Sequence, residues 1–280
     1  MRVFTGSADL QKSLANDLRV SKSIGFVPTM GALHDGHLKL VKDALKACDR
    51  VVVSIFVNPR QFDNPNDLIR YPRNLEQDTS LLQRVGCHYL FTPDEMGVYA
   101  NEADLEYDFG SLMKTLEGAF RPGHFEGMLS VVHQLLAIVQ PHSLFMGEKD
   151  FQQAALVKRL IKAQHPMVHF HLTDTVREPD GLAMSSRNVL LSSENRMLAK
   201  LIPLALKKIV ALPDLATCIN ALTPIAQELI ASGIRVDYLQ IRREDDLGEI
   251  QPNDGFDRHR VFFAGYVGVV RLIDNMALLF

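Results

Sequence analysis

The sequence predicts an α/β fold: a Rossmann-like parallel sheet that binds a nucleotide, followed by a smaller α+β domain. Over about the first 175 residues, short apolar segments alternate with helical patterns, which indicates a parallel sheet with right-handed crossovers. After that point two helical segments come first and strands follow, an order typical of a separate α+β unit. We therefore expect a Rossmann-like domain at 1–176 and a small C-terminal α+β domain at 177–280.

The strands expected in the first domain are short and apolar. The clearest is 51–57 (VVVSIFV), whose β-branched run indicates a strand covered on both faces. The other strands are predicted at 24–28, 88–91, 143–146 and 168–176. Helices are predicted at 37–48, 75–85, 127–139 and 151–162.

The second domain is expected to begin within the turn-rich segment 177–192. Its helices are predicted at 193–210 and 215–231, and its strands at 235–241, 260–264 and 267–272, the last two as a hairpin.

Composition and charge exclude several classes of function. The formal net charge of −3 gives no electrostatic support to general nucleic-acid binding, so we expect no nucleic-acid partner. No apolar run reaches the roughly 18 residues that cross a bilayer, and the N-terminus lacks a secretory apolar stretch, so we expect a cytoplasmic protein with no membrane partner. The isolated cysteines Cys48, Cys87 and Cys218 show no metal-binding spacing and are expected to be reduced.

The segment PTMGALHDGH (28–37) lies between a predicted strand and a predicted helix. Its glycines permit close backbone approach, and a helix N-terminus favours anions. His34 and His37 fall on one side of the first turn, where both can donate to a phosphate chain and stabilise charge as pyrophosphate leaves. Two alternatives are a histidine pair that ligates a metal and a pair of surface histidines, although no third ligand or HExxH pattern is evident.

Two further segments carry phosphate-binding groups. GEKD (147–150) lies at another strand-to-helix junction, where Lys149 can contact phosphate and Asp150 can cap the helix or bind a ribose hydroxyl. MSSR (184–187) offers two hydroxyls and a guanidinium, which suit a triphosphate. Taken singly, the first could be a solvated helix end and the second an exposed loop. Because all three segments follow strands of one predicted sheet, together they predict a site for a phosphate chain.

In order and spacing, MGALHDGH, GEKD and MSSR resemble the pantothenate synthetase (pantoate–β-alanine ligase) family. The resemblance extends to FVNPRQF (56–62), YPR (71–73), RPGHFEG (121–127) and RLIDN (271–275), and so covers nearly the whole chain. More distantly, the His-x-Gly-His and Ser-Ser-Arg segments resemble nucleotidyltransferases and class I aminoacyl-tRNA synthetases, which also cleave ATP between the α and β phosphates.

The resemblance implies a role for each matching residue. The ATP-binding residues would be Met30, Gly31, Ala32, Leu33, His34, Asp35, Gly36, His37, Gly147, Glu148, Lys149, Asp150, Val176, Met184, Ser185, Ser186 and Arg187. The catalytic residues would be His37, as proton donor to the leaving group, with His34, Lys149 and Arg187. Gln61 and Gln153 match two amides that hold pantoate, a role open to groups that both donate and accept. Arg121 and His124 would either fix a loop or contact substrate.

The implied reaction is an ATP-dependent ligation in two steps. The carboxylate of pantoate attacks the α-phosphorus to give pantoyl adenylate and pyrophosphate, and the amine of β-alanine then displaces AMP. Mg²⁺ would be held mostly by phosphates and water, with Asp78 as a candidate protein contact. The resemblance also implies a homodimer, and the turn-rich junction at 177–192 indicates that the second domain acts as a lid.

Two other functions share some of these features. A nucleotidyltransferase that adenylates a phosphorylated acceptor would need additional cationic residues, whereas the paired glutamines favour an uncharged polyol with one carboxylate. A non-catalytic nucleotide- or RNA-binding module would not need both histidines, Lys149 and Arg187.

Overall fold

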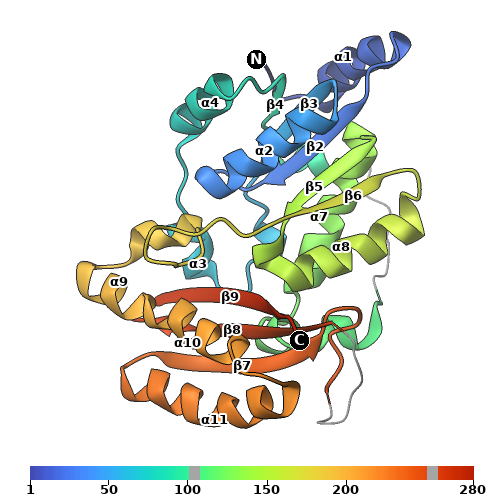
Figure 1. The fold of residues 1–280 in the computed structure, drawn as a ribbon. Coiled ribbons are helices and arrows are strands. Elements are labelled where there is room, and N and C mark those ends of the chain that lie inside the picture. The colour runs from blue at the N-terminus through green and yellow to red at the C-terminus, as the bar shows by residue number, and fades with distance from the viewer. Residues whose placement is uncertain (101–107, 251–257) are drawn as a thin grey trace. The chain divides into compact units, whose positions relative to one another are not determined.

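A computed structural model describes residues 1–100, 108–250 and 258–280. The chain divides into two compact units, each assembled from separate stretches of sequence (Figure 1). The N-terminal unit comprises Met1–Phe109, Arg121–Glu148 and Leu156–Asp174; the C-terminal unit comprises Gly110–Phe120, Lys149–Ala155 and Thr175–Phe280. Two short stretches that precede residue 176 thus group with the C-terminal unit, which a single division of the sequence does not anticipate.

The N-terminal unit is built on a six-stranded parallel sheet with the order β1-β4-β3-β2-β5-β6. Its strands are β1 (Arg2–Phe4), β2 (Ile24–Thr29), β3 (Arg50–Ile55), β4 (Tyr89–Phe91), β5 (Ser143–Gly147) and β6 (His169–Thr173). The chain moves from β2 through β3 to β4 and then returns to place β5 on the other side of β2 (Figure 1). The boundary between β2 and β5 is therefore the switch point at which sheets of this kind bind ligands.

Helices connect the parallel strands. They are α1 (Ser7–Arg19), α2 (Asp35–Ala47), α3 (Pro65–Arg70), α4 (Leu75–Arg84), α5 (Glu95–Tyr99), α7 (His124–Val139) and α8 (Phe151–Gln164), with a 3-10 turn η1 (Pro59–Gln61). Helix α2 packs on β2, β3 and β5, where Val41 and Ala44 join Val27, Val53 and Phe145 in one buried cluster. Helix α7 is buried along most of its length, as its apolar sequence predicts.

The C-terminal unit contains a three-stranded antiparallel sheet in the order β7-β8-β9. Its strands are β7 (Arg235–Arg243), β8 (His259–Val267) and β9 (Val270–Leu278). The predicted hairpin is present, but its turn is at 268–269 and not at 265–266, so Val267 ends β8 instead of beginning the next strand. Val267 pairs with Val270 across this two-residue turn, in which Gly268 has a φ of 61°. Together the two sheets confirm the α/β class with a smaller α+β unit.

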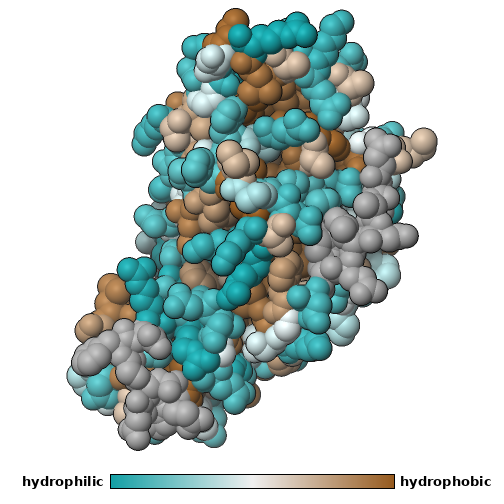
Figure 2. Space-filling view, turned by 90° about the vertical axis from the view of Figure 1, so that its right-hand side faces the viewer, coloured by the Kyte–Doolittle hydropathy of each residue, from teal (hydrophilic) through white to brown (hydrophobic). Residues whose placement is uncertain are grey.

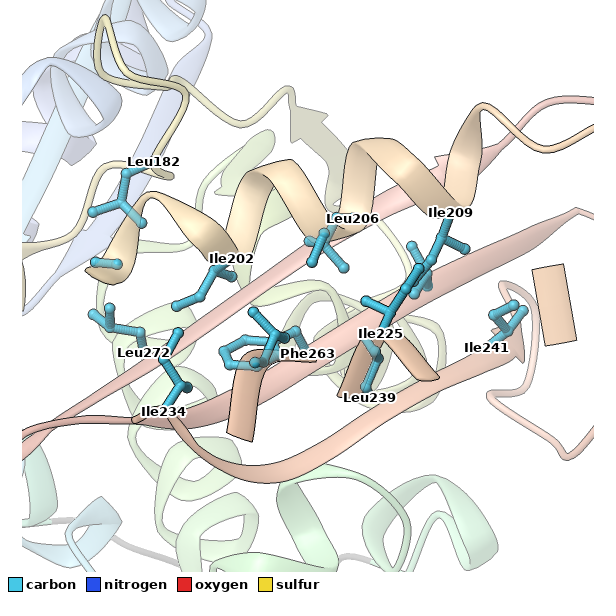
Figure 3. Packing of buried hydrophobic residues seen from close by; sticks show 14 of the residues in the cluster. Leu182, Ile202, Leu206, Ile209, Ile225, Ile234, Leu239, Ile241, Phe263 and Leu272 are labelled. Atoms are coloured by element: carbon cyan, nitrogen blue, oxygen red, sulfur yellow. The ribbon is translucent and has the colours of Figure 1, made fainter. Parts of the chain in front are cut away.

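Helices cover one face of this small sheet. They are α9 (Ser193–Ala199), α10 (Leu201–Val210) and α11 (Leu215–Ala231). The short elements elsewhere in the chain are η2 (Gly110–Met113), α6 (Glu117–Phe120), η3 (Glu148–Asp150) and η4 (Ser186–Leu190). Ile202, Leu206 and Ile209 of α10 pack against Phe263 of β8 and Ile225 of α11 (Figure 3).

Other details of the chain also differ from the elements expected from sequence. The predicted helix 193–210 is two helices that meet at Lys200. Pro203 lies in the first turn of α10, where its missing N–H is tolerated, whereas a continuous helix would need that donor. The N-terminal pair β1 and α1 was not predicted: β1 has three residues, and the helical pattern of α1 is mostly polar.

On the face seen in Figure 2, hydrophilic residues are interleaved with hydrophobic ones. Within the described ranges, no helix has both the length and the apolar character that crossing a bilayer requires. Cys48, Cys87 and Cys218 are buried, and none of the three forms a disulfide.

Candidate functional site

The loop between β2 and α2 has an unusual backbone. Gly31 and Ala32 both adopt left-handed conformations, with φ of 81° and 49°. Glycine takes this conformation readily, but alanine does so at a cost, so surrounding contacts must hold the loop in this shape.

Asp78 in the first turn of α4 supplies those contacts. Its Oδ2 accepts a hydrogen bond from the backbone N–H of Ala32 (2.9 Å), and its Oδ1 accepts from that of Leu33 (2.7 Å). Asp78 is only 2% exposed, and burial raises its pKa, while the two backbone hydrogen bonds act in the opposite direction. A Cβ on Gly31 would lie 3.0 Å from Oδ2, so glycine also leaves the space that this carboxylate occupies.

Thr29, the last residue of β2, fixes the start of the same loop. Its hydroxyl donates to the carbonyl of Ser54 on β3 (2.7 Å) and accepts from the N–H of Gly31 (3.2 Å). Thr29 thus links the loop to β3, and Asp78 links it to α4.

His34 and His37 form the N-terminal cap of α2. The Nδ1 of His34 accepts from the N–H of Gly36 (3.2 Å), and the Nδ1 of His37 accepts from the N–H of His34 (3.3 Å). A neutral imidazole that accepts at Nδ1 carries its proton on Nε2. The backbone therefore selects the tautomer in which each ring is a donor at Nε2, and the two ring centroids lie 4.0 Å apart.

Gln61 adjoins this loop within the N-terminal unit. Its amide nitrogen lies 2.9 Å from Sδ of Met30. The turn η1 that carries Gln61 packs closely against α7. The contact requires glycine at position 127, because a Cβ there would overlap the backbone carbonyl of Arg60. Asn58, which is fully buried, donates to the carbonyl of Gly127 (3.0 Å) and caps η1.

The RPGH segment also contacts η1. The carbonyl of Gln61 lies 2.8 Å from Nδ1 of His124 and 3.4 Å from Nη2 of Arg121. Arg121 further pairs with Asp63 (3.0 Å). Arg121 and His124 were expected either to fix a loop or to contact substrate, and these contacts favour the fixing of a loop.

The GEKD segment spans the division between the units. Gly147 and Glu148 belong to the N-terminal unit, while Lys149, Asp150 and Gln153 group with the C-terminal unit. The ammonium of Lys149 lies 3.6 Å from Oδ1 of Asp150. Gln153 is half-buried on α8.

The MSSR segment belongs to the C-terminal unit. Its backbone is held by a hydrogen bond from Met184 to the carbonyl of Val176 (3.0 Å) and by an antiparallel bridge between Arg177 and Ala183. The hydroxyl of Ser185 accepts from the N–H of Arg187 (3.3 Å) and caps η4.

The predicted site residues thus form two groups, one in each unit. The N-terminal unit holds Met30, Gly31, Ala32, Leu33, His34, Asp35, Gly36, His37, Gln61, Asp78, Gly147 and Glu148. The C-terminal unit holds Lys149, Asp150, Gln153, Val176, Met184, Ser185, Ser186 and Arg187.

Asp78 was expected to contact a metal ion, and its geometry offers little for that role. Both oxygens accept backbone hydrogen bonds and the side chain is buried. Among the residues with a described position, no group of three His, Cys, Asp or Glu side chains could hold a metal. Both oxygens of Asp78 are thus already engaged by the loop backbone.

Sequence reasoning missed several residues that shape the site, including Thr29 and Asn58. The Asn58-Pro59 pair is a turn signal and could have indicated a cap. The hydroxyl of Thr29 acts through a neighbouring strand, so no local pattern marks it.

Comparison with known proteins gives one consistent result. The family model described as pantoate-beta-alanine ligase matches residues 2–277. Pantothenate synthetase from Chelativorans sp. (strain BNC1) is 42% identical over 98% of this chain and 96% of its own length, and that from Marinomonas sp. (strain MWYL1) is 40% identical over 99% of each.

Solved structures agree with these sequence matches. Pantothenate synthetase from Thermus thermophilus superposes with a TM-score of 0.89 at 38% identity, covering 99% of both chains. A pantoate-beta-alanine ligase from Francisella tularensis, complexed with beta-gamma ATP and beta-alanine, gives a TM-score of 0.84 at 38% identity over 99% of this chain and 97% of its own. With sequence and fold matched over nearly its full length, the chain belongs to the pantoate–β-alanine ligase family.

Proposed function

We infer that this protein is an ATP-dependent ligase that condenses pantoate with β-alanine through a pantoyl-adenylate intermediate, releasing pyrophosphate and AMP. The observation that carries this inference is the match to the ligase family over residues 2–277. The Francisella relative whose structure contains beta-gamma ATP and beta-alanine supports ATP and β-alanine as substrates here.

The first step requires no protein nucleophile, because the carboxylate of pantoate is already ionised at neutral pH. It attacks the α-phosphorus, the bond to the bridging oxygen breaks, and pyrophosphate leaves with the negative charge. We assign His34 and His37 to that charge, because the backbone keeps a proton on Nε2 of each ring. Lys149 and Arg187 would add fixed positive charge on the phosphates.

The second step transfers the pantoyl group. The neutral amine of β-alanine attacks the acyl carbon, the bond to the phosphate oxygen of AMP breaks, and AMP leaves with the negative charge. The amine releases its proton to water as the amide forms. We assign Gln61 and Gln153 to pantoate, since amides can donate to its carboxylate and accept from its hydroxyls. The position of Gln61 beside Met30 supports this assignment.

The alternative of a nucleotidyltransferase that adenylates a phosphorylated acceptor is not favoured. The family match covers nearly the whole chain, and the residues adjoining the histidine loop include the neutral Gln61.

We propose that Mg²⁺ enters with the triphosphate and is held by phosphate oxygens and water, as this cation prefers. The engagement of both Asp78 oxygens with backbone amides supports a binding mode without that side chain. Mg²⁺ would neutralise charge on the phosphates.

We also propose that residues 177–280 form a lid, that the protein is a homodimer and that it acts in the cytoplasm. The turn-forming residues before Met184 support the lid. The family resemblance supports the dimer, and the three free cysteines support the cytoplasmic location. Small-angle scattering with and without ATP and pantoate would report both mass and compaction. A monomeric mass would contradict the dimer, and an unchanged radius of gyration would contradict the lid.

The proposed reaction has a direct test. We expect pyrophosphate release that depends on pantoate in the absence of β-alanine, followed by stoichiometric AMP release when β-alanine is added. Pyrophosphate release with a phosphorylated acceptor but not with pantoate would instead establish the nucleotidyltransferase.

Replacing His37 with alanine should leave the fold intact and slow adenylation by about 10²–10³-fold, the usual effect of losing one preorganised donor. The rate would be measured as pantoate-dependent pyrophosphate release at saturating ATP. The control is the exposed His169→Ala on β6, which should retain full activity. A near-normal rate for His37→Ala would remove His37 from the mechanism.

Replacing Gln61 or Gln153 with alanine should raise the KM for pantoate by about 10- to 100-fold, because hydrogen bonds to a charged group are lost. The KM for ATP should change little. Gln83→Ala, an exposed glutamine on α4, serves as the control. If the ATP dependence changes and the pantoate dependence does not, the assignment is wrong.

Replacing Asp78 with asparagine leaves one acceptor for two buried N–H groups. We expect a loss of about 1–3 kcal/mol in the free energy of unfolding, together with slower adenylation. The Mg²⁺ concentration for half-maximal activity should stay the same, measured beside the exposed control Glu76→Gln on the same helix. A marked rise in that concentration would establish Asp78 as a metal ligand.

A further inference from the structure

Two adjacent residues of β9, Asp274 and Asn275, are polar and nearly fully buried, with 3% and 4% of their surfaces exposed. They belong to the RLIDN segment, to which the proposed mechanism assigns no role. Consecutive side chains of a strand point to opposite faces, so one strand can hold a different segment on each side.

Asn275 holds the backbone of Lys149. Its Nδ2 donates to the carbonyl of Lys149 (2.8 Å), and its Oδ1 accepts from Nη1 of Arg260 (2.5 Å). Because a guanidinium has only donors, Oδ1 must face Arg260 and the NH₂ group must face Lys149. Arg260 is itself fixed by Glu244 (2.8 Å) and by the ring of Phe151, 4.3 Å from its guanidinium carbon.

Asp274 holds the segment that leads into the MSSR loop. Its two oxygens accept from Nη1 and Nη2 of Arg177 at 2.7 and 2.9 Å. Nη1 of Arg177 also donates to the carbonyl of Gly181 (3.1 Å), and the backbone of Arg177 bridges to Ala183. A bidentate ion pair with both partners confined is a geometrically specific anchor.

We propose that Asp274 and Asn275 are a positioning pair: side by side on β9, they fix the Lys149 backbone and the base of the 184–187 loop relative to one another. All of these contacts lie within the C-terminal unit. The pair sets the spacing of the Lys149 ammonium and the Arg187 guanidinium against a phosphate chain without touching that chain. This inference rests on the proposed function, because that function makes Lys149 and Arg187 phosphate ligands.

The test is a double-mutant cycle on ATP binding. Asn275→Asp keeps the size of the side chain and an acceptor for Arg260 but replaces the donor to Lys149 with an acceptor. We expect it to weaken binding of a non-hydrolysable ATP analogue, measured by calorimetry with Mg²⁺, by about 3- to 10-fold. In a Lys149→Ala background the same substitution should have almost no effect, because Asn275 acts through Lys149.

The control is Asp237→Asn. It removes the negative charge that pairs with Arg271 (2.9 Å) in the same sheet and should leave the affinity for the analogue unchanged. A second cycle pairs Asp274→Asn with Arg187→Ala and should show the same loss of effect in the double variant. It keeps the proposal testable if Asn275→Asp fails to fold.

Equal losses of affinity in the wild-type and Lys149→Ala backgrounds would show a general structural effect and overturn the proposal, as would unchanged binding by Asn275→Asp. Because binding is measured without pantoate, this result is separate from the proposed reaction. A wild-type protein that binds the analogue but releases no pantoate-dependent pyrophosphate would overturn the proposed function while the cycle still decides the role of Asn275.

Discussion

The parallel pairing of β2 with β3 on one side and β5 on the other is the constraint on which the candidate site depends. Its register sets Thr29 opposite Ile55, so the histidine loop and the η1 segment leave the sheet at the same edge. The buried run Val51–Val53 holds this register, because β3 is covered on both faces and a displaced pairing would lose that packing. The hydrogen bond from Thr29 to the Ser54 carbonyl extends the pairing into the loop.

At that edge, hydrogen bonds from the backbone orient the side chains of His34 and His37. The left-handed turn at Gly31 and Ala32 brings two N–H groups onto Asp78, and the first turn of α2 uses its own amides to orient both imidazoles. Donors whose direction is fixed before the substrate arrives need no reorganisation during the reaction, and the role proposed for the two histidines toward pyrophosphate requires such donors.

Much of this arrangement could be predicted from sequence, and the exceptions have physical causes. The β-branched run of β3 and the periodic pattern of α11 marked their elements because burial dictates their residue types. Asp78 could not be assigned to the loop, since 46 residues separate it from Ala32 and a carboxylate in a first helical turn has an ordinary local explanation. Nor could the sequence show that Lys149 groups with the C-terminal unit or that it contacts β9, a strand more than a hundred residues later.

The attachment of Lys149 to β9 has a consequence for how the protein is made. The sheet of the N-terminal unit is complete in sequence at Thr173, so its strands are all available while later residues are still being synthesised. The carbonyl of Lys149, by contrast, can accept its hydrogen bond from Asn275 only after a further 126 residues have been synthesised. While the strands of the parallel sheet and the histidine loop are already synthesised, Lys149 therefore still lacks this anchor.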